Sequence, residues 1–180
     1  MPLHPDFEEI LFSREIVEQR VHELGAAITK DYAGRNLLLV GILRGAMLFM
    51  ADLARAIDLP LEMDMIEAKS YNGTESTGQV RITKDVETSL AGRDVLLVED
   101  IYDTGRTLRE IVALMRVRNP NSVEVCCLLE KPDRRVIEVP VKYTGFTIAD
   151  KFVVGYGLDY NERYRNIQDI GVLKKEIYSE

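Results

Sequence analysis

Residues Val95 to Thr107 read Val-Leu-Leu-Val-Glu-Asp-Ile-Tyr-Asp-Thr-Gly-Arg-Thr, and this stretch decides the fold of the chain. Val95 to Val98 has the length and the β-branched content of a buried parallel strand. Apolar residues then recur at helical spacing: Leu108, Ile111, Val112 and Met115. Three acids and a Thr/Gly-rich turn therefore lie between a strand and a helix. Open α/β sheets bind ligands at this edge, where the free N–H groups of the helix favour an anion.

The turn from Asp103 to Thr107, the phosphate cradle, is therefore expected to bind a phosphate group on Thr104 to Thr107. Glu99 and Asp100 would then face the rest of the ligand. Carboxylates beside a phosphate suggest ribose hydroxyls, a Mg²⁺ ion, or both. The sequence thus predicts a site for a ribose phosphate.

Asp103-Thr104-Gly105 is also the tripeptide that supplies the catalytic carboxylate of aspartic proteases. Those proteases are all-β proteins, whereas here the tripeptide joins a buried strand to an amphipathic helix, so the context argues against a protease. A solvated loop with Asp103 capping the helix is the simplest structural alternative. Three acids within five residues after a buried strand make that alternative the weaker one.

The same succession of strand, turn and helix occurs on both sides of this stretch. Ser13 is expected to cap a first helix that ends near Gly34, and a second helix is expected over residues 47–57. Strands are expected at Leu37 to Leu43, Leu61 to Ala68, Gln79 to Thr83, Val95 to Val98 and Val123 to Leu129. This order predicts a doubly wound α/β fold with a central, mainly parallel sheet flanked by helices.

The composition indicates one domain that binds a small molecule. The chain has 180 residues, of which 46% are hydrophobic, and its formal net charge is -7. An acidic chain is a poor partner for nucleic acid or an anionic membrane. The N-terminus lacks the pattern of a signal peptide, and the longest apolar run is too short to span a bilayer. Cys126 and Cys127 are expected to be buried and reduced, so we expect a cytoplasmic protein.

Val95 to Thr107 resembles the phosphoribosyl pyrophosphate binding motif of the type I phosphoribosyltransferases. Four further segments carry the resemblance: Gly41 to Gly45, Lys69 to Tyr71, Leu129 to Pro132 and Asp150 to Arg165. The last run is the most specific, and together the segments resemble the hypoxanthine-guanine phosphoribosyltransferases in their short bacterial form. Tyr102 is bulkier than the branched aliphatic usual there, and Glu67 is acidic where some relatives are basic. Both departures concern only the detail of the pocket.

The resemblance implies the type I phosphoribosyltransferase fold in a single domain over residues 1–180. The core of that domain is expected at about 37–130. A small hood formed by the termini, from about 1–12 and 131–180, is expected to lie next to it.

The resemblance also implies which residues bind phosphoribosyl pyrophosphate. They are Arg44, Gly45, Ser70, Tyr71, Glu99, Asp100, Asp103, Thr104, Gly105, Arg106, Thr107 and Arg165. A cis peptide between Leu43 and Arg44 is implied, and the segment from Ser70 to Gly78 is expected to close over the reacting ribose. Asp103 is the implied catalytic base, which accepts a proton from N7 of the purine.

The purine itself is expected to contact Lys131, Phe152, Val153 and Asp159. Lys131 is implied to donate to the 6-oxo oxygen and Phe152 to stack on the base, although a surface lysine and a core phenylalanine are the simpler alternatives. The implied cofactor is Mg²⁺. Its implied protein ligands are Glu99, Asp100 and Asp159.

These roles imply transfer of 5-phosphoribose to hypoxanthine or guanine, giving IMP or GMP and pyrophosphate, a step of purine salvage. Two alternatives stay open. One is a transferase that prefers xanthine or guanine, and the other is a non-catalytic regulator that senses phosphoribosyl pyrophosphate on the same fold. The regulator is disfavoured because about 36 residues before the first core strand leave little room for a DNA-binding domain. Family members are dimers or tetramers, so a homodimer or homotetramer is expected, with no nucleic acid or membrane partner.

Overall fold

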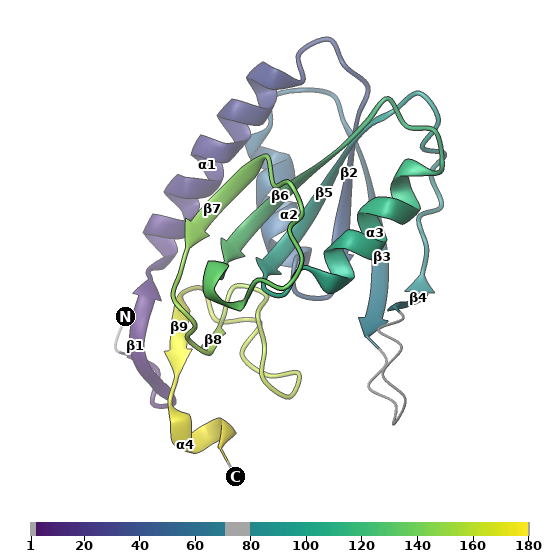
Figure 1. The fold of residues 1–180 in the computed structure, drawn as a ribbon. Coiled ribbons are helices and arrows are strands. Elements are labelled where there is room, and N and C mark those ends of the chain that lie inside the picture. The colour runs from purple at the N-terminus through teal and green to yellow at the C-terminus, as the bar shows by residue number, and fades with distance from the viewer. Residues whose placement is uncertain (1–2, 71–79, 180) are drawn as a thin grey trace.

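The computed structural model of this chain describes residues 3–70 and 80–179. Its main sheet has six strands in the order β4-β3-β2-β5-β6-β7. These strands are β2 (Leu37–Leu43), β3 (Glu62–Ser70), β4 (Val80–Lys84), β5 (Asp94–Tyr102), β6 (Ser122–Glu130) and β7 (Tyr143–Thr147). Only β4 runs antiparallel to its neighbour, so the other five carboxyl ends meet at one edge. In Figure 1 the arrowheads of β5, β6 and β7 point to this edge.

Helices cover both faces of the main sheet, which confirms the predicted fold class. α1 (Arg14–Asp31) and α2 (Met47–Ala56) pack on one face, and α3 (Arg106–Arg116) packs on the other. Side chains of β5 alternate between the two cores: Leu96 and Val98 face α1 and α2, whereas Leu97 faces α3. A central strand buried on both faces explains why Val95 to Val98 is an unbroken apolar run.

A second, three-stranded sheet joins the two ends of the chain. β1 (Phe7–Phe12) and β8 (Val153–Val154) each pair antiparallel with β9 (Ile170–Leu173), and the short helix α4 (Lys175–Tyr178) follows. This sheet lies beyond the carboxyl edge of the main sheet (Figure 1). None of the helices in the described part of the chain is long and apolar enough to cross a membrane.

Three details differ from the expectations. β5 continues past Val98 to Tyr102, paired with β6 as far as Glu130, so Glu99 and Asp100 lie within the strand and not after it. Ser13 occupies the N-cap position but makes no side-chain cap hydrogen bond, and α1 ends at Asp31 rather than near Gly34.

The third difference is β7, which belongs to the main sheet although the hood was expected from residue 131 onward. Its five residues include Gly145, where a Cβ would overlap the backbone carbonyl of Leu128. A short strand that contains glycine gives no apolar run, so the sequence does not identify β7 as a strand. The glycine instead allows the backbones of β7 and β6 to approach closely. The chain therefore leaves the main sheet after Thr147.

Candidate active site

The phosphate cradle lies between β5 and the first turn of α3. Gly105 is the N-cap of α3 and has a φ of 83°, and a Cβ there would also overlap the carbonyl of Ile137. Residues from Glu99 to Leu108 line a cavity of about 100 Å³ at this turn. The N-terminal N–H groups of a helix lack intrahelical acceptors, so this end of α3 suits an anion. Asp103 does not cap the helix, which removes the alternative of a simple capped loop.

Glu99 and Asp100 form a buried acid pair beside the cradle. Burial and the neighbouring Asp100 charge hold the pKa of Glu99 well above its usual value. Burial also raises the pKa of Asp100, while its hydrogen bonds and the positive charge of Arg165 act in the opposite direction. Within the described residues, neither carboxylate is in an ion pair with a lysine or arginine. The pair therefore offers carboxylate oxygens without a cationic side-chain partner, and a bound cation would favour their ionised form.

The turn between β2 and α2 contacts this acid pair directly. The Leu43–Arg44 peptide is cis, as the resemblance implied. A Cβ on Gly45 would overlap the carboxylate of Asp100, and a Cβ on Gly157 would overlap the carbonyl of Gly45. Two glycines thus bring the turn, the acid pair and the loop before β9 into contact.

Lys131 begins a chain of alternating charges that ends at Asp103. It directly follows β6 and is 8% exposed, and its Nζ lies 3.4 Å from Oδ1 of Asp150. Nη1 of Arg134 lies 3.4 Å from Oδ2 of Asp150, and Nε of Arg134 donates to Oδ1 of Asp103 at 2.8 Å. The lysine expected to read the base and the expected catalytic carboxylate are therefore connected through two further residues.

Aromatic rings surround Phe152, the residue expected to stack on the base. Phe152 is 37% exposed, and its ring stacks on Tyr178 with centroids 4.5 Å apart. The ring of Tyr160 meets it edge-on at 5.7 Å. Val153 is buried and pairs with Val172 in the small sheet, so its side chain is part of the protein interior.

Asp159 and Arg165 lie together in the loop before β9. Nη2 of Arg165 is 2.8 Å from Oδ1 of Asp159, and Nη1 donates to the carbonyl of Gly157 at 2.7 Å. In the described residues no group of three or more His, Cys, Asp or Glu side chains is arranged to hold a metal. The three expected Mg²⁺ ligands, Glu99, Asp100 and Asp159, are therefore not one preformed cluster, because Asp159 faces Arg165.

The acid pair nevertheless fits Mg²⁺. This ion is usually bound through one or two carboxylates and completes its shell with water and substrate phosphates. A buried pair of carboxylates beside a phosphate cradle supplies that number of protein oxygens.

Part of the expected site lies outside the described residues. Tyr71 and most of the loop expected to close over the ribose belong to residues 71–79. Ser70 ends β3, where it pairs with Val80.

Four residues near the site were not assigned by sequence reasoning. Asp150 stands in the run that carries the family resemblance, so its position was a signal, whereas Arg134 stands only in a charged turn after Lys131. Glu162 contacts Arg44 and Arg165, and Tyr178 stacks on Phe152. Glu162 stands in the same run as Asp150, but its contact with Arg44 joins residues 118 positions apart and the stacking of Tyr178 on Phe152 also depends on the fold, so no local pattern identifies these two contacts.

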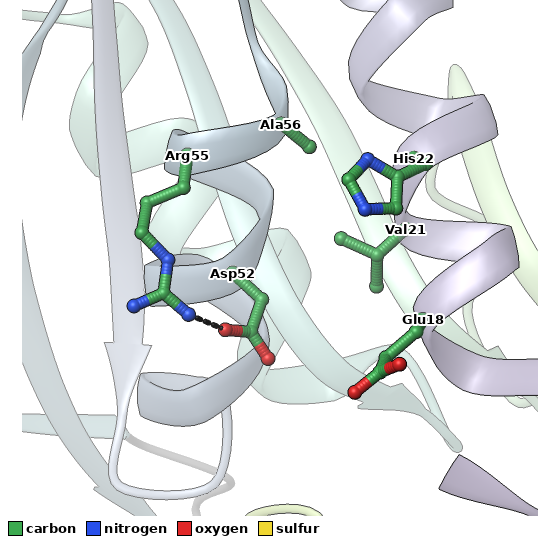
Figure 2. Close-up of a pocket in the computed structure, with 6 residues that line it drawn as sticks. All are labelled: Glu18, Val21, His22, Asp52, Arg55 and Ala56. Carbon is green, nitrogen blue, oxygen red and sulfur yellow. Dashed lines mark hydrogen bonds and ion pairs between the residues drawn. The ribbon is translucent and has the colours of Figure 1, made fainter. Parts of the chain in front are cut away.

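A second cavity, of about 180 Å³, lies between α1 and the C-terminal turns of α2. Figure 2 shows that Glu18 and His22 line it from α1, and that Asp52 and Arg55 line it from α2. Asp52 is already engaged, since it pairs with Arg55 and accepts a hydrogen bond from the hydroxyl of Tyr156 at 2.6 Å. No helix N-terminus and no buried charged group lies there, so the candidate active site is the one at the carboxyl edge.

Fold and site together define a parallel α/β protein that binds an anionic ligand at the carboxyl ends of its strands. Residues 9–161 match the family model described as a phosphoribosyl transferase domain. Over 98% of its length the chain is 49% identical to the hypoxanthine-guanine phosphoribosyltransferase of Staphylococcus aureus strain Mu50, of which it covers 99%. It is also 50% identical, over 99% of its length, to the bifunctional protein TilS/HprT of Listeria monocytogenes, but it spans only 28% of that protein.

Solved structures agree with these matches. The crystal structure of a hypoxanthine phosphoribosyltransferase from Staphylococcus aureus superposes with a TM-score of 0.95 at 49% identity, covering 98% of this chain and 97% of that one. A hypoxanthine phosphoribosyl transferase of Trypanosoma cruzi gives a TM-score of 0.94 at 36% identity, with coverage of 99% and 97%. The chain therefore belongs to the phosphoribosyltransferase family, among its hypoxanthine-guanine members.

Proposed function

We propose that this protein transfers 5-phosphoribose from phosphoribosyl pyrophosphate to N9 of hypoxanthine or guanine, giving IMP or GMP and pyrophosphate in purine salvage. Lys131 carries the proposal, because it is the one lysine or arginine buried among the residues that the structure describes. A lysine offers three donors and no acceptor. It matches the 6-oxo oxygen of these purines and opposes the 6-amino group of adenine.

Each part of the site has a role in the proposed reaction. Cleavage of the bond between C1 and pyrophosphate develops positive charge on the ribose, as in glycoside cleavage. The 5-phosphate binds the cradle, while Glu99 and Asp100 lie beside the ribose and favour that charge. Arg165 and the backbone N–H groups at Arg44 bind the departing diphosphate, and the guanidinium of Arg44 adds positive charge beside them. Asp103 accepts the N7 proton as N9 attacks, and fixed positions lower the barrier further.

Mg²⁺ is part of the proposal, and Glu99, Asp100 and Asp159 are the residues that would hold it. When bound, the ion neutralises charge on the diphosphate leaving group. We expect excess chelator to abolish turnover and added Mg²⁺ to restore it, as followed by nucleotide absorbance. Full turnover in the presence of chelator would exclude the metal from the reaction.

The test of the proposed function is a panel of bases. The protein is incubated with phosphoribosyl pyrophosphate, Mg²⁺ and one base at a time: hypoxanthine, guanine, xanthine, adenine or uracil. We expect nucleotide from hypoxanthine and guanine. Preference for xanthine would support the xanthine-guanine alternative, and binding of phosphoribosyl pyrophosphate without turnover on any base would support a regulator.

We further propose that the chain works as a single domain in the cytoplasm and assembles as a homodimer or homotetramer. The family resemblance supports the assembly, and two free, buried cysteines, Cys126 and Cys127, support a reducing compartment. Light scattering coupled to size exclusion measures the mass in solution. The mass of one subunit at micromolar concentration would refute the assembly.

A further inference from the structure

Glu162 joins the two arginines that the proposed function assigns to diphosphate. Its Oε2 lies 3.3 Å from Nη1 of Arg44 and 3.2 Å from Nη2 of Arg165. Arg44 follows β2 and Arg165 precedes β9, so this one carboxylate oxygen connects the main sheet to the loop that lies against it. It is an anion held between two guanidinium groups.

The backbone around Glu162 holds the side chain in this place. Tyr160 and Arg163 exchange backbone hydrogen bonds of 3.2 and 3.0 Å, which close a tight turn. Within it, Glu162 has a φ of 61°, and its N–H donates to Oδ2 of Asp159 at 2.9 Å. A glutamate in the left-handed region is uncommon. The turn therefore presents the carboxylate from a defined backbone position.

Arg165 keeps capacity for another anion. Its Nε is buried without a hydrogen-bond partner among the described residues. The side chain of Arg165 is 22% exposed, whereas that of Glu162 is 65% exposed. Glu162 can therefore swing into solvent more easily than Arg165 can leave its place.

We propose that Glu162 is an intramolecular competitor for the diphosphate site: beside the ion pairs of Arg44 with Glu67 and of Arg165 with Asp159, it pairs with both arginines in the free protein and is displaced when diphosphate binds. This inference rests on the proposed function. A carboxylate carries one negative charge, whereas diphosphate carries several, so the two arginines attract diphosphate more strongly than they attract Glu162. The exchange lowers affinity for diphosphate and, by the same amount, favours its departure as product.

The test compares Glu162→Gln with Glu18→Gln. The first variant keeps the shape of the side chain and removes its charge. The second removes an exposed glutamate charge that is paired with Arg14 away from the site. Calorimetry measures the Kd of each protein for pyrophosphate with Mg²⁺, and separately for IMP, whose phosphate is assigned to the cradle.

We expect Glu162→Gln to bind pyrophosphate about 2- to 5-fold tighter than wild type, a change typical of the loss of exposed ion pairs. The Kd for IMP should change less than twofold, and Glu18→Gln should match wild type for both ligands. Unchanged affinity for pyrophosphate would overturn the inference. An equal gain for both ligands would also overturn it, since that result indicates a general effect of net charge.

Failure of the inference differs from failure of the proposed function. If wild type forms nucleotide but Glu162→Gln gains no affinity for pyrophosphate, only the competition is wrong. If wild type neither binds pyrophosphate nor forms nucleotide, both are wrong.

Discussion

Asp103 is the last of four charged side chains in contact, after Lys131, Asp150 and Arg134. This contact fixes how its carboxylate can act as a base. Its Oδ1 accepts a hydrogen bond from Arg134, and its Oδ2 has no hydrogen-bond partner within the described residues. A carboxylate oriented through one oxygen can present the second to a substrate. Arg134 is thus placed to orient the base that the proposed mechanism requires.

We predict that Asp103→Asn lowers kcat by roughly 100-fold or more while phosphoribosyl pyrophosphate still binds, because the amide keeps an acceptor for Arg134 but cannot take a proton. Steady-state kinetics and calorimetric binding measure the two effects separately. Asp133→Asn, at an exposed carboxylate next to Arg134, is the control and should behave as wild type. A kcat close to wild type in Asp103→Asn would remove this residue from the role of base.

Single residues also show the limit of sequence reasoning. Three groups could be assigned because they stand in or beside recognisable motifs: the acid pair, the phosphate cradle and Lys131. Arg134 and Glu162 could not. Arg134 contacts Asp103, which is 31 positions away, and Glu162 contacts Arg44, which is 118 positions away; both contacts exist only after the chain has folded, and the local pair of Glu162 with Arg165 does not by itself indicate a role.

At the scale of elements, the segment after β4 is fixed to β3 by one carboxylate. Asp64 accepts hydrogen bonds from the backbone N–H groups of Glu87 and Thr88 at 2.9 and 2.8 Å. It also lies 3.7 Å from Nζ of Lys84. Burial raises the pKa of Asp64, but hydrogen bonds from Thr88, Met65 and Glu87 outweigh it and leave the pKa below the usual 3.8.

A lowered pKa in the folded state means that the ionised form of Asp64 stabilises the fold. This stability is present above the unfolded pKa and is lost as the pH falls through the folded one. We predict that Asp64→Asn lowers the free energy of unfolding at pH 7 by about 2 kcal/mol. The difference in unfolding free energy between this variant and wild type should become smaller below about pH 4. Denaturant titrations of both proteins between pH 7 and the acid range below about pH 4 test this prediction. A difference in unfolding free energy that does not change with pH would contradict the stabilising role of ionised Asp64.

The contact between Gly157 and the β2–α2 turn is a second element-level feature. Gly157 has a φ of 101°, and a Cβ there would overlap the carbonyl of Gly45. Gly34 has a φ of 74° but open space around a Cβ. An alanine has a strained backbone at both positions. Only at Gly157 would its Cβ also displace the turn between β2 and α2.

We predict that Gly157→Ala lowers kcat/KM for phosphoribosyl pyrophosphate by about 10-fold or more, because it displaces Gly45 and Arg44. Gly34→Ala should lose stability, by about 1 kcal/mol, with kcat/KM unchanged. Kinetics and thermal unfolding of both variants distinguish the two effects. Equal kinetic losses in the two variants would show that backbone strain alone is responsible.

At the scale of the whole molecule, the main sheet could be predicted because its central strands are buried on both faces. Leu37 to Leu43 was predicted with the bounds that the structure shows, because a continuous apolar run of this length is typical of a strand buried on both faces. The small sheet could not be predicted as a sheet. Its strands come from residues 7–12, 153–154 and 170–173, and their pairing depends on bringing the two ends of the chain together.

At the same scale, the proposed function places selection of the base at the carboxyl edge, where β6 ends at Glu130 and Lys131 follows. A site built to hydrogen-bond one group can discriminate by about 10⁴-fold, since the wrong ligand leaves a buried polar group unpaired. Lys131→Met keeps the stem and removes the charge. Its partner Asp150 is half exposed, so solvent can satisfy the carboxylate that the substitution leaves behind.

The most direct test of the central claim is therefore kcat/KM for hypoxanthine, guanine and adenine in wild type and in Lys131→Met. We predict that wild type uses both oxopurines and rejects adenine. The substitution should lower kcat/KM for the oxopurines and narrow their advantage over adenine, with unfolding behaviour close to wild type. Equal use of adenine and hypoxanthine by wild type, or an unchanged ratio in the variant, would contradict the assignment of this site to 6-oxopurines.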